Sequence, residues 1–224
     1  MDIKSTPALE LKDVSKSYGD YRVLKSLSIQ IASGERVALM GPSGSGKSTL
    51  LNCCSGIDFV DSGEVRVVGK VLNSMSQKEL ESVRKTQVGY VFQQFNLLPT
   101  LTAFENIELP AQLIGLPKDE RLERVNQLLM QVGLEQKSNQ LPGTMSGGEK
   151  QRIAVARALV HKPGLILADE PTGSLDSKSG EQVLQLLEDL SQENQTALLL
   201  VTHDQASTRI CHRVLSMKDG AIAS

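Results

Sequence analysis

Residues 41–49 read Gly-Pro-Ser-Gly-Ser-Gly-Lys-Ser-Thr, directly after the short apolar run at 37–40. A strand that runs into closely spaced glycines, followed by a helix, is the usual setting of a phosphate-binding loop. The glycines leave room for backbone N–H groups to surround phosphate oxygens, and the positive end of the helix adds to the attraction. Lys47 can reach the β- and γ-phosphates, and the Ser48 hydroxyl can bind the Mg²⁺ that bridges them. We therefore predict a nucleoside triphosphate site formed by Gly41, Pro42, Ser43, Gly44, Ser45, Gly46, Lys47, Ser48 and Thr49.

Length and charge are consistent with one globular domain. The chain has 224 residues, with 24 lysines and arginines against 26 aspartates and glutamates. The basic residues are scattered singly, so we expect no nucleic-acid partner. The first seven residues lack the apolar core of a secretory signal, and the longest apolar runs are too short to cross a bilayer. Cys53, Cys54 and Cys211 lack the spacing of a metal site. We expect a single cytoplasmic domain over residues 1–224.

Apolar runs along the chain predict an α/β fold. Short β-type runs at 9–14, 27–31 and 65–68 indicate a small antiparallel layer beside the nucleotide site. Two buried strand runs, 165–168 and 198–201, are separated by a helical segment, which indicates a parallel sheet covered by helices.

Other patterns complete this fold prediction. From about 94 to 160 the sequence becomes mainly helical, with apolar residues at helical spacing from Leu122 to Val132. Asp219-Gly220 predicts a hairpin near the end of the chain. We therefore predict a P-loop NTPase core, mainly a parallel sheet with flanking helices, with an antiparallel β layer and a helical subdomain inserted at roughly 94–160.

Two acids follow the predicted strand at 165–168. At the carboxyl end of this strand, Asp169 would lie beside the phosphate loop and hold the Mg²⁺ directly or through water. Glu170 would point to the other side, where it could polarise a water for in-line attack on the γ-phosphate. Either acid alone would be read as a solvated strand end. Together with the phosphate loop they indicate triphosphate hydrolysis.

A third segment, residues 145–152, reads Met-Ser-Gly-Gly-Glu-Lys-Gln-Arg. It resembles the signature segment of ATP-binding-cassette (ABC) ATPases, although that family usually has Leu first and Gln fifth. Ser146 and Glu149 have the spacing of a capping box, which predicts a helix start that presents the N–H groups of Gly147 and Gly148 to an anion. In the family this anion is the γ-phosphate of ATP bound by the other protomer.

The resemblance extends over nearly the whole chain and implies roles for four more residues. Tyr18 resembles the aromatic residue that stacks on adenine, and Gln93 resembles the glutamine at the Mg²⁺ and water site. Asp176 lies in a segment that looks like the loop crossing the dimer interface, and His203 resembles the histidine that contacts the γ-phosphate. Each residue alone would be read as packing, a solvated loop, a helix cap or a structural histidine.

By the same resemblance, we expect a head-to-tail homodimer that binds ATP and Mg²⁺ and drives a separate integral membrane permease. The chain would then be cytoplasmic and peripheral on the cytoplasmic face of the inner membrane. Segment 92–107, with its apolar side chains and polar breaks, is the expected docking region. Together with residues 168–173 and 202–204, the sequence at 101–107 most resembles the branch of lipoprotein-releasing, macrolide-exporting and cell-division-associated ATPases.

Other functions are compatible with parts of this pattern. A soluble ABC ATPase acting on DNA or ribosomes usually carries tandem cassettes, coiled-coil insertions or basic arms, and none is visible in this sequence. A small-molecule kinase could use the same phosphate loop, but it must exclude the water that Glu170 would polarise. A nutrient-import ATPase is the nearest alternative within transport.

Overall fold

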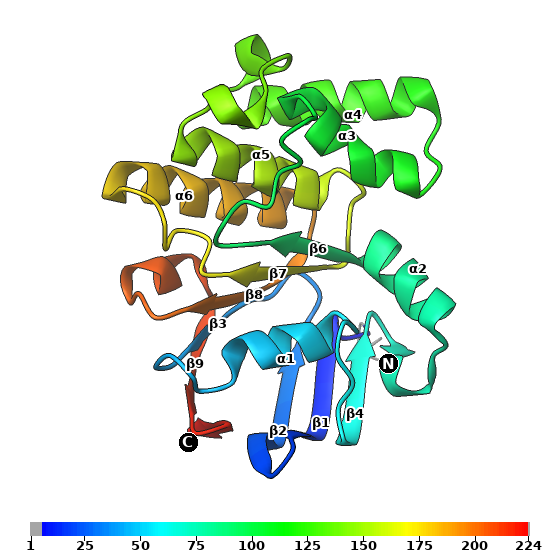
Figure 1. Cartoon of the computed structure of the whole chain (residues 1–224), viewed down its shortest axis with the longest axis vertical. Helices are drawn as coiled ribbons and strands as arrows, with labels where there is room; N and C mark the ends of the chain where they lie inside the picture. Colours follow the sequence, from blue (N-terminus) through cyan, green and yellow to red (C-terminus); the bar gives the residue numbers. More distant parts are fainter. Residues whose placement is uncertain (1–5, 224) are drawn as a thin grey trace, which may run out of the picture.

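Two β-sheets and the helices packed against them form the structure, a computed structural model that describes residues 6–223 (Figure 1). The larger sheet, called here the central sheet, has the strand order β10-β9-β3-β8-β7-β6. Its strands from β9 to β6 run parallel, and β10 pairs antiparallel with β9 at one edge. In chain order these strands are β3 (Arg36–Met40), β6 (Val88–Val91), β7 (Leu165–Asp169), β8 (Ala197–Thr202), β9 (Arg213–Lys218) and β10 (Ala221–Ala223).

The smaller sheet is antiparallel and has the order β2-β1-β4-β5. Its strands are β1 (Leu9–Tyr18), β2 (Tyr21–Ile31), β4 (Ser62–Val67) and β5 (Lys70–Val71). Helix α1 (Lys47–Cys54) contacts β2 and β4 of this sheet and also β7 of the central sheet. It therefore lies between the two sheets, where its N-terminal end meets the carboxyl end of β3 (Figure 1).

Most other helices lie on the face of the central sheet that points away from α1 (Figure 1). The helices after α1 are α2 (Gln77–Gln87), α3 (Ala103–Leu113), α4 (Lys118–Gln131), α5 (Gly147–Leu159) and α6 (Ser177–Glu193). Helix α3 packs on α4 and α5, while α5 also contacts α6 and β6. No strand forms between β6 and β7, so the segment 94–160 contributes helices and loops alone.

The apolar strands of the central sheet contribute side chains to two hydrophobic cores. Successive side chains of a strand point to opposite faces. Leu165 and Leu167 of β7 therefore join the core between the two sheets, while Ile166 and Ala168 join the core under helices α3–α6. All residues of β8 are buried. Burial on both faces explains why these strands read as continuous apolar runs rather than as alternating ones.

The predicted fold class is confirmed in its main features. The antiparallel layer, the mainly parallel sheet and the helical segment at 94–160 are all present. The predicted hairpin also forms, because Asp219 and Gly220 both take positive φ values, 49° and 82°, as a tight two-residue turn requires.

Several element boundaries differ from the prediction. Strands β1 and β2 extend beyond the predicted 9–14 and 27–31. The prediction was too short because the outer parts of these strands carry polar, exposed side chains and pair irregularly, which hides the alternation of apolar and polar residues. Helix α2 was not predicted, although Ser76 and Glu79 form a complete capping box at its start. No helix within residues 6–223 combines the length and the apolar character needed to span a membrane.

Candidate functional site

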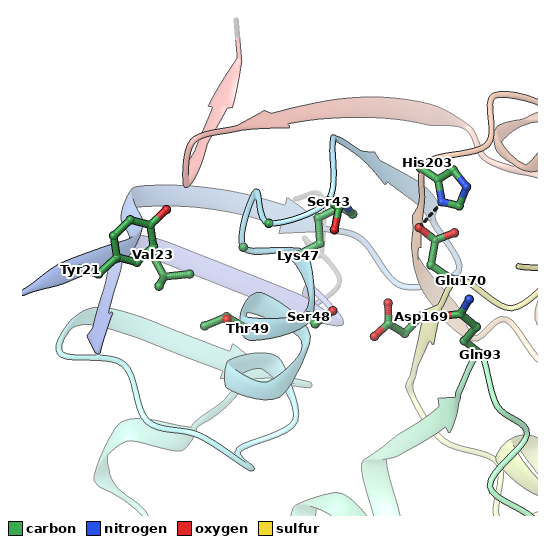
Figure 2. A pocket seen from close by; sticks show the side chains of 12 residues that line it. Tyr21, Val23, Ser43, Lys47, Ser48, Thr49, Gln93, Asp169, Glu170 and His203 are labelled. Atoms are coloured by element: carbon green, nitrogen blue, oxygen red, sulfur yellow. Dashed lines mark hydrogen bonds and ion pairs between the residues drawn. The ribbon is translucent and has the colours of Figure 1, made fainter. Parts of the chain in front are cut away.

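A cleft of about 650 Å³ opens at the carboxyl ends of the central strands (Figure 2). It is lined by the phosphate loop on one side and by the ends of β6, β7 and β8 on the other. The lining residues are Tyr21, Val23, Ser43, Gly44, Gly46, Lys47, Ser48, Thr49, Gln93, Asp169, Glu170 and His203. The fold thus brings together residues that are distant in the sequence, as expected for ligand sites in parallel α/β sheets.

The phosphate loop leaves several polar groups without partners. Gly44 and Gly46 take positive φ values of 79° and 102°, a conformation that glycine adopts without a steric penalty. The first N–H groups of a helix have no intrahelical acceptor, and no side chain within residues 6–223 caps the start of α1. The Ser45 hydroxyl is buried and makes no hydrogen bond with any residue that the structure describes. These unsatisfied donors fit a bound anion such as a phosphate group.

Lys47 supplies a positive charge at the same place. Its side chain is largely buried, and its ammonium group donates to the carbonyls of Gly41 and Pro42, at 2.8 Å each. Within residues 6–223, no carboxylate lies within 4.0 Å of this ammonium group. A buried cation without an acidic partner favours an anionic ligand.

The hairpin β9–β10 packs against the phosphate loop. The Gly220 N–H donates to the carbonyl of Ser45 at 3.2 Å, and the Gly220 carbonyl accepts from Lys25 N–H at 2.8 Å. A side chain at Gly41 would place a Cβ 2.2 Å from the carbonyl oxygen of Met217. The loop is therefore held between β2 and the end of β9, and close packing excludes any side chain at position 41.

Asp169 faces the start of α1 across the cleft (Figure 2). Burial raises the pKa of this carboxyl group, a hydrogen bond from Ser48 lowers it, and the charge of Glu170 raises it again. Gln93 lies on the same side. Its backbone carbonyl accepts a hydrogen bond from the Ser174 hydroxyl at 2.9 Å, which leaves the side-chain amide free of that contact. A hydroxyl, a carboxylate and an amide are the oxygen donors that Mg²⁺ prefers, so Ser48, Asp169 and Gln93 fit the predicted metal site.

Glu170 is fixed by three contacts with the end of β8 and the residue after it. Its carboxylate lies 2.8 Å from Nδ1 of His203 and accepts a hydrogen bond from the Thr202 hydroxyl at 3.3 Å (Figure 2). Its N–H donates to the carbonyl of Val201 at 2.9 Å. With φ of 45°, Glu170 is a left-handed non-glycine residue, a strained conformation that often marks a functional site. This turn directs the carboxylate into the cleft.

The predicted signature segment lies outside the cleft of its own chain, since none of its residues lines it. Ser146 is the N-cap of α5 and accepts from Glu149 N–H at 3.3 Å, while the Glu149 carboxylate accepts from Ser146 N–H at 2.8 Å. The predicted capping box is therefore confirmed, and it leaves Gly147 and Gly148 in the first turn of the helix. Asp176 also lies outside the cleft, where it caps the N-terminus of α6.

The aromatic side of the cleft is lined by a residue other than the predicted Tyr18, whose role beside the adenine stays a prediction. Tyr18 does not line it: its hydroxyl donates to Asp58, a contact that raises the pKa of Tyr18, and the Lys16 ammonium lies 5.1 Å from its ring centroid. Tyr21 and Val23 line the cleft instead, and the sequence reasoning missed both. Their spacing of two residues on a strand, which puts both side chains on one face, could have identified them.

A protein-family model matches most of the chain. Residues 24–173 match the family model described as ABC transporter. The chain belongs to the ABC transporter family. This membership confirms the predicted α/β P-loop fold and the prediction of an ATP-binding-cassette ATPase.

Individual ABC transporter proteins resemble the chain over most of its length. The lipoprotein-releasing system ATP-binding protein LolD of Bacteroides fragilis is 42% identical over 96% of this chain and 99% of its own length. The macrolide export ATP-binding/permease protein MacB of Pasteurella multocida is 43% identical over 96% of this chain, which spans only 34% of MacB. A solved dimeric structure of the cassette MJ0796, in a post-hydrolysis state bound to ADP and Pi, is 42% identical with a TM-score of 0.87, covering 96% of this chain and 97% of that one.

Proposed function

We propose that the chain hydrolyses ATP at two composite sites of a head-to-tail homodimer, and that this cycle drives a separate membrane subunit. The observation that carries the proposal is the position of the Glu170 carboxylate, which lies in the same cleft as Lys47, Ser48 and Asp169. A cleft that holds both phosphate-binding groups and an oriented carboxylate is suited to hydrolysis.

The phosphate loop and Lys47 would bind the β- and γ-phosphates, with Tyr21 and Val23 at the open end beside them. Ser48, Gln93 and Asp169 would hold Mg²⁺, which neutralises phosphate charge when it is bound. The partly buried Asp169 must be ionised to serve as a ligand. Burial raises the pKa of this carboxyl group, and the hydrogen bond from Ser48 and the Lys47 ammonium offset that rise only in part.

Glu170 would accept a proton from the attacking water. Its carboxylate oxygens have more lone pairs than the contacts with His203 and Thr202 use, so an acceptor position remains for that water. His203 would orient the Glu170 carboxylate through Nδ1 and present its other ring nitrogen to the γ-phosphate. Gln93 would contact the same Mg²⁺ and water site and link it to the helical segment that follows.

The second half of each site would come from the partner protomer. Ser146, Gly147 and Gly148 lie outside the cleft of their own chain, so a second copy must bring them to the γ-phosphate. The dimeric arrangement of the MJ0796 cassette supports this assembly. Asp176 and its neighbours would cross the interface between the protomers, and Tyr18 would approach the adenine from the rim.

The membrane partner is inferred from the named relatives. LolD belongs to a lipoprotein-releasing system, and MacB joins an ATP-binding part and a permease part in one chain. We propose a comparable role in export or lipoprotein release for this chain, with its position on the cytoplasmic face of the membrane. Nutrient import and a soluble role are the alternatives that identification of a co-purifying membrane subunit would decide.

Removal of Mg²⁺ is expected to stop ATP turnover by the purified chain. Without the metal, phosphate charge stays uncompensated, so we expect a loss of about 100-fold or more in the hydrolysis rate with EDTA. Asp169→Asn should raise the Mg²⁺ concentration needed for half-maximal rate by about tenfold, because one anionic ligand is lost. Asp119→Asn, an exposed residue in the first turn of α4, is the matched control. Turnover that is unchanged in EDTA would exclude the proposed metal site.

Leu98 is the probe for the proposed docking segment. Its backbone is fixed by Asn106, whose side chain accepts from Leu98 N–H at 2.8 Å and donates to the Leu98 carbonyl at 3.1 Å. Its side chain is 44% exposed. By contrast, Leu97 and Phe104 pack against the helical core.

Leu98→Glu is expected to leave ATP binding and thermal stability unchanged but to abolish co-purification with the membrane subunit. A charge against a docked apolar surface costs several kcal/mol when it finds no partner. Met130→Glu places the same charge on an exposed apolar residue of α4 and is the control. The docking surface lies elsewhere if the Leu98→Glu protein recovers as much membrane subunit as the Met130→Glu protein.

A further inference from the structure

The first turn of α5 carries a negative charge that one lysine compensates. One oxygen of the Glu149 carboxylate accepts from Ser146 N–H in the capping box, and the other pairs with the ammonium group of Lys137. This hydrogen bond with Lys137 is the main reason why the pKa of Glu149 is lowered. Within residues 6–223, Lys137 is the only cation within 4.0 Å of this carboxylate.

The Lys137–Glu149 pair is less exposed than an ordinary surface ion pair. The Glu149 side chain is only 16% exposed and that of Lys137 is 36% exposed. Lys137 N–H donates to the carbonyl of Leu134, and the Lys137 carbonyl accepts from Gln140 N–H, both at 2.9 Å. Because the Glu149 carboxylate is largely buried, solvent and salt screen this contact less than they screen an exposed pair.

The loop of Lys137 is also tied to the start of α3. Phe104 N–H donates to the carbonyl of Ser138, and Ala103 N–H donates to the carbonyl of Gln140, both at 2.9 Å. These contacts fix the backbone that carries Lys137 relative to α3, which packs on α5. They also connect it to the segment that leads from Gln93 into α3.

A carboxylate at this position matters because of what the turn would bind. The N–H groups of Gly147 and Gly148 lie in the same turn as Glu149. If this turn receives the γ-phosphate of ATP held by the partner protomer, an uncompensated Glu149 would repel that phosphate. The capping contact alone does not need this charge, since a glutamine amide oxygen accepts the same hydrogen bond.

We propose that Lys137 is a positioning residue for the composite site: it neutralises Glu149 and so allows the first turn of α5 to accept the γ-phosphate of ATP bound by a second copy of this chain. This inference rests on the proposed homodimer. Lys137 makes no contact with the nucleotide in this arrangement, and it acts through Glu149.

The test compares the effect of Lys137→Met with and without Glu149→Gln. Both comparisons use the Glu170→Gln background, in which ATP is not turned over, and measure ATP-dependent dimerisation by analytical ultracentrifugation and ATP affinity by equilibrium dialysis. With Glu149 present, Lys137→Met should weaken dimerisation by about five- to tenfold at low salt, because the carboxylate is left uncompensated. When Glu149→Gln is also present, the same change should cost less than about twofold.

Two further measurements separate this role from a structural one. The defect of Lys137→Met should shrink as the salt concentration rises, since screening weakens charge repulsion. ATP affinity at the phosphate loop should match that of Lys78→Met, which alters an exposed lysine in α2.

Two results would overturn the inference. The first is dimerisation of Lys137→Met that is as strong as that of Lys78→Met. The second is an equal loss of dimerisation by Lys137→Met with and without Glu149→Gln, which would make the pair a purely structural contact. A different result tests the proposed function: a Glu170→Gln protein that binds ATP but stays monomeric would refute the homodimer, and with it this role of Lys137.

Discussion

Glu170→Gln is expected to lower the rate of ATP hydrolysis by about 100- to 10,000-fold, because the amide keeps the shape of the carboxylate but cannot accept a proton from water. The amide oxygen can still accept from the Thr202 hydroxyl, so the turn after β7 should keep its geometry. ATP affinity should therefore stay within about twofold of the unmodified protein, since Lys47 and the phosphate loop are untouched. The variant should also accumulate as an ATP-bound dimer in solution.

The measurement is steady-state phosphate release together with the molar mass in the presence of ATP and Mg²⁺. Glu123→Gln removes an exposed carboxylate from α4, outside the cleft, and is the matched control. The assignment of Glu170 as general base fails if the Glu170→Gln protein hydrolyses ATP as fast as the Glu123→Gln protein.

Two inactive variants are expected to restore activity to each other when they are mixed. Lys47→Ala removes the cation of the phosphate loop, and Ser146→Arg blocks the start of α5, which lies outside the cleft of its own chain. Each variant alone should lose about 100-fold or more in turnover. Lys47→Ala should bind ATP weakly, while Ser146→Arg should bind it normally and fail to close the dimer.

In an equimolar mixture that exchanges subunits freely, half of the dimers contain one copy of each variant. Each mixed dimer has one site with both Lys47 and Ser146 intact and one site with neither. If the two sites act independently, the mixture should recover about a quarter of the unmodified activity. Mixing each variant with itself is the control. No recovery, with mixed dimers demonstrated by mass spectrometry, would mean that each site is built within a single chain.

Local features of the site could be predicted from the sequence because they depend on a few consecutive residues. The phosphate loop is set by glycine spacing, and the capping box of Ser146 and Glu149 joins residues only three positions apart. The same reasoning would have found α2 from Ser76 and Glu79 had it been applied there. The buried strands were predictable because both their faces are apolar.

Features that depend on tertiary contacts were not predictable. Whether Tyr18 or Tyr21 lines the cleft is decided by the pairing of β1 with β2 and by the hydrogen bond from Tyr18 to Asp58, which is distant in the chain. The left-handed backbone of Glu170 depends on an acceptor, the Val201 carbonyl, that lies on another strand. Lys137 opposite Glu149 likewise results from the way the loop after α4 folds against α3 and α5.

The hydrogen bond between Gly220 and Ser45 joins two residues that the ribosome makes at very different times. About 175 residues separate them. At a translation rate of roughly 5–20 residues per second, Gly220 is therefore added about 10–35 s after the phosphate loop. Strand β3 likewise lacks its neighbours β8 and β9 during that interval. In a nascent chain the phosphate loop therefore lacks this support until the β9–β10 hairpin has left the exit tunnel.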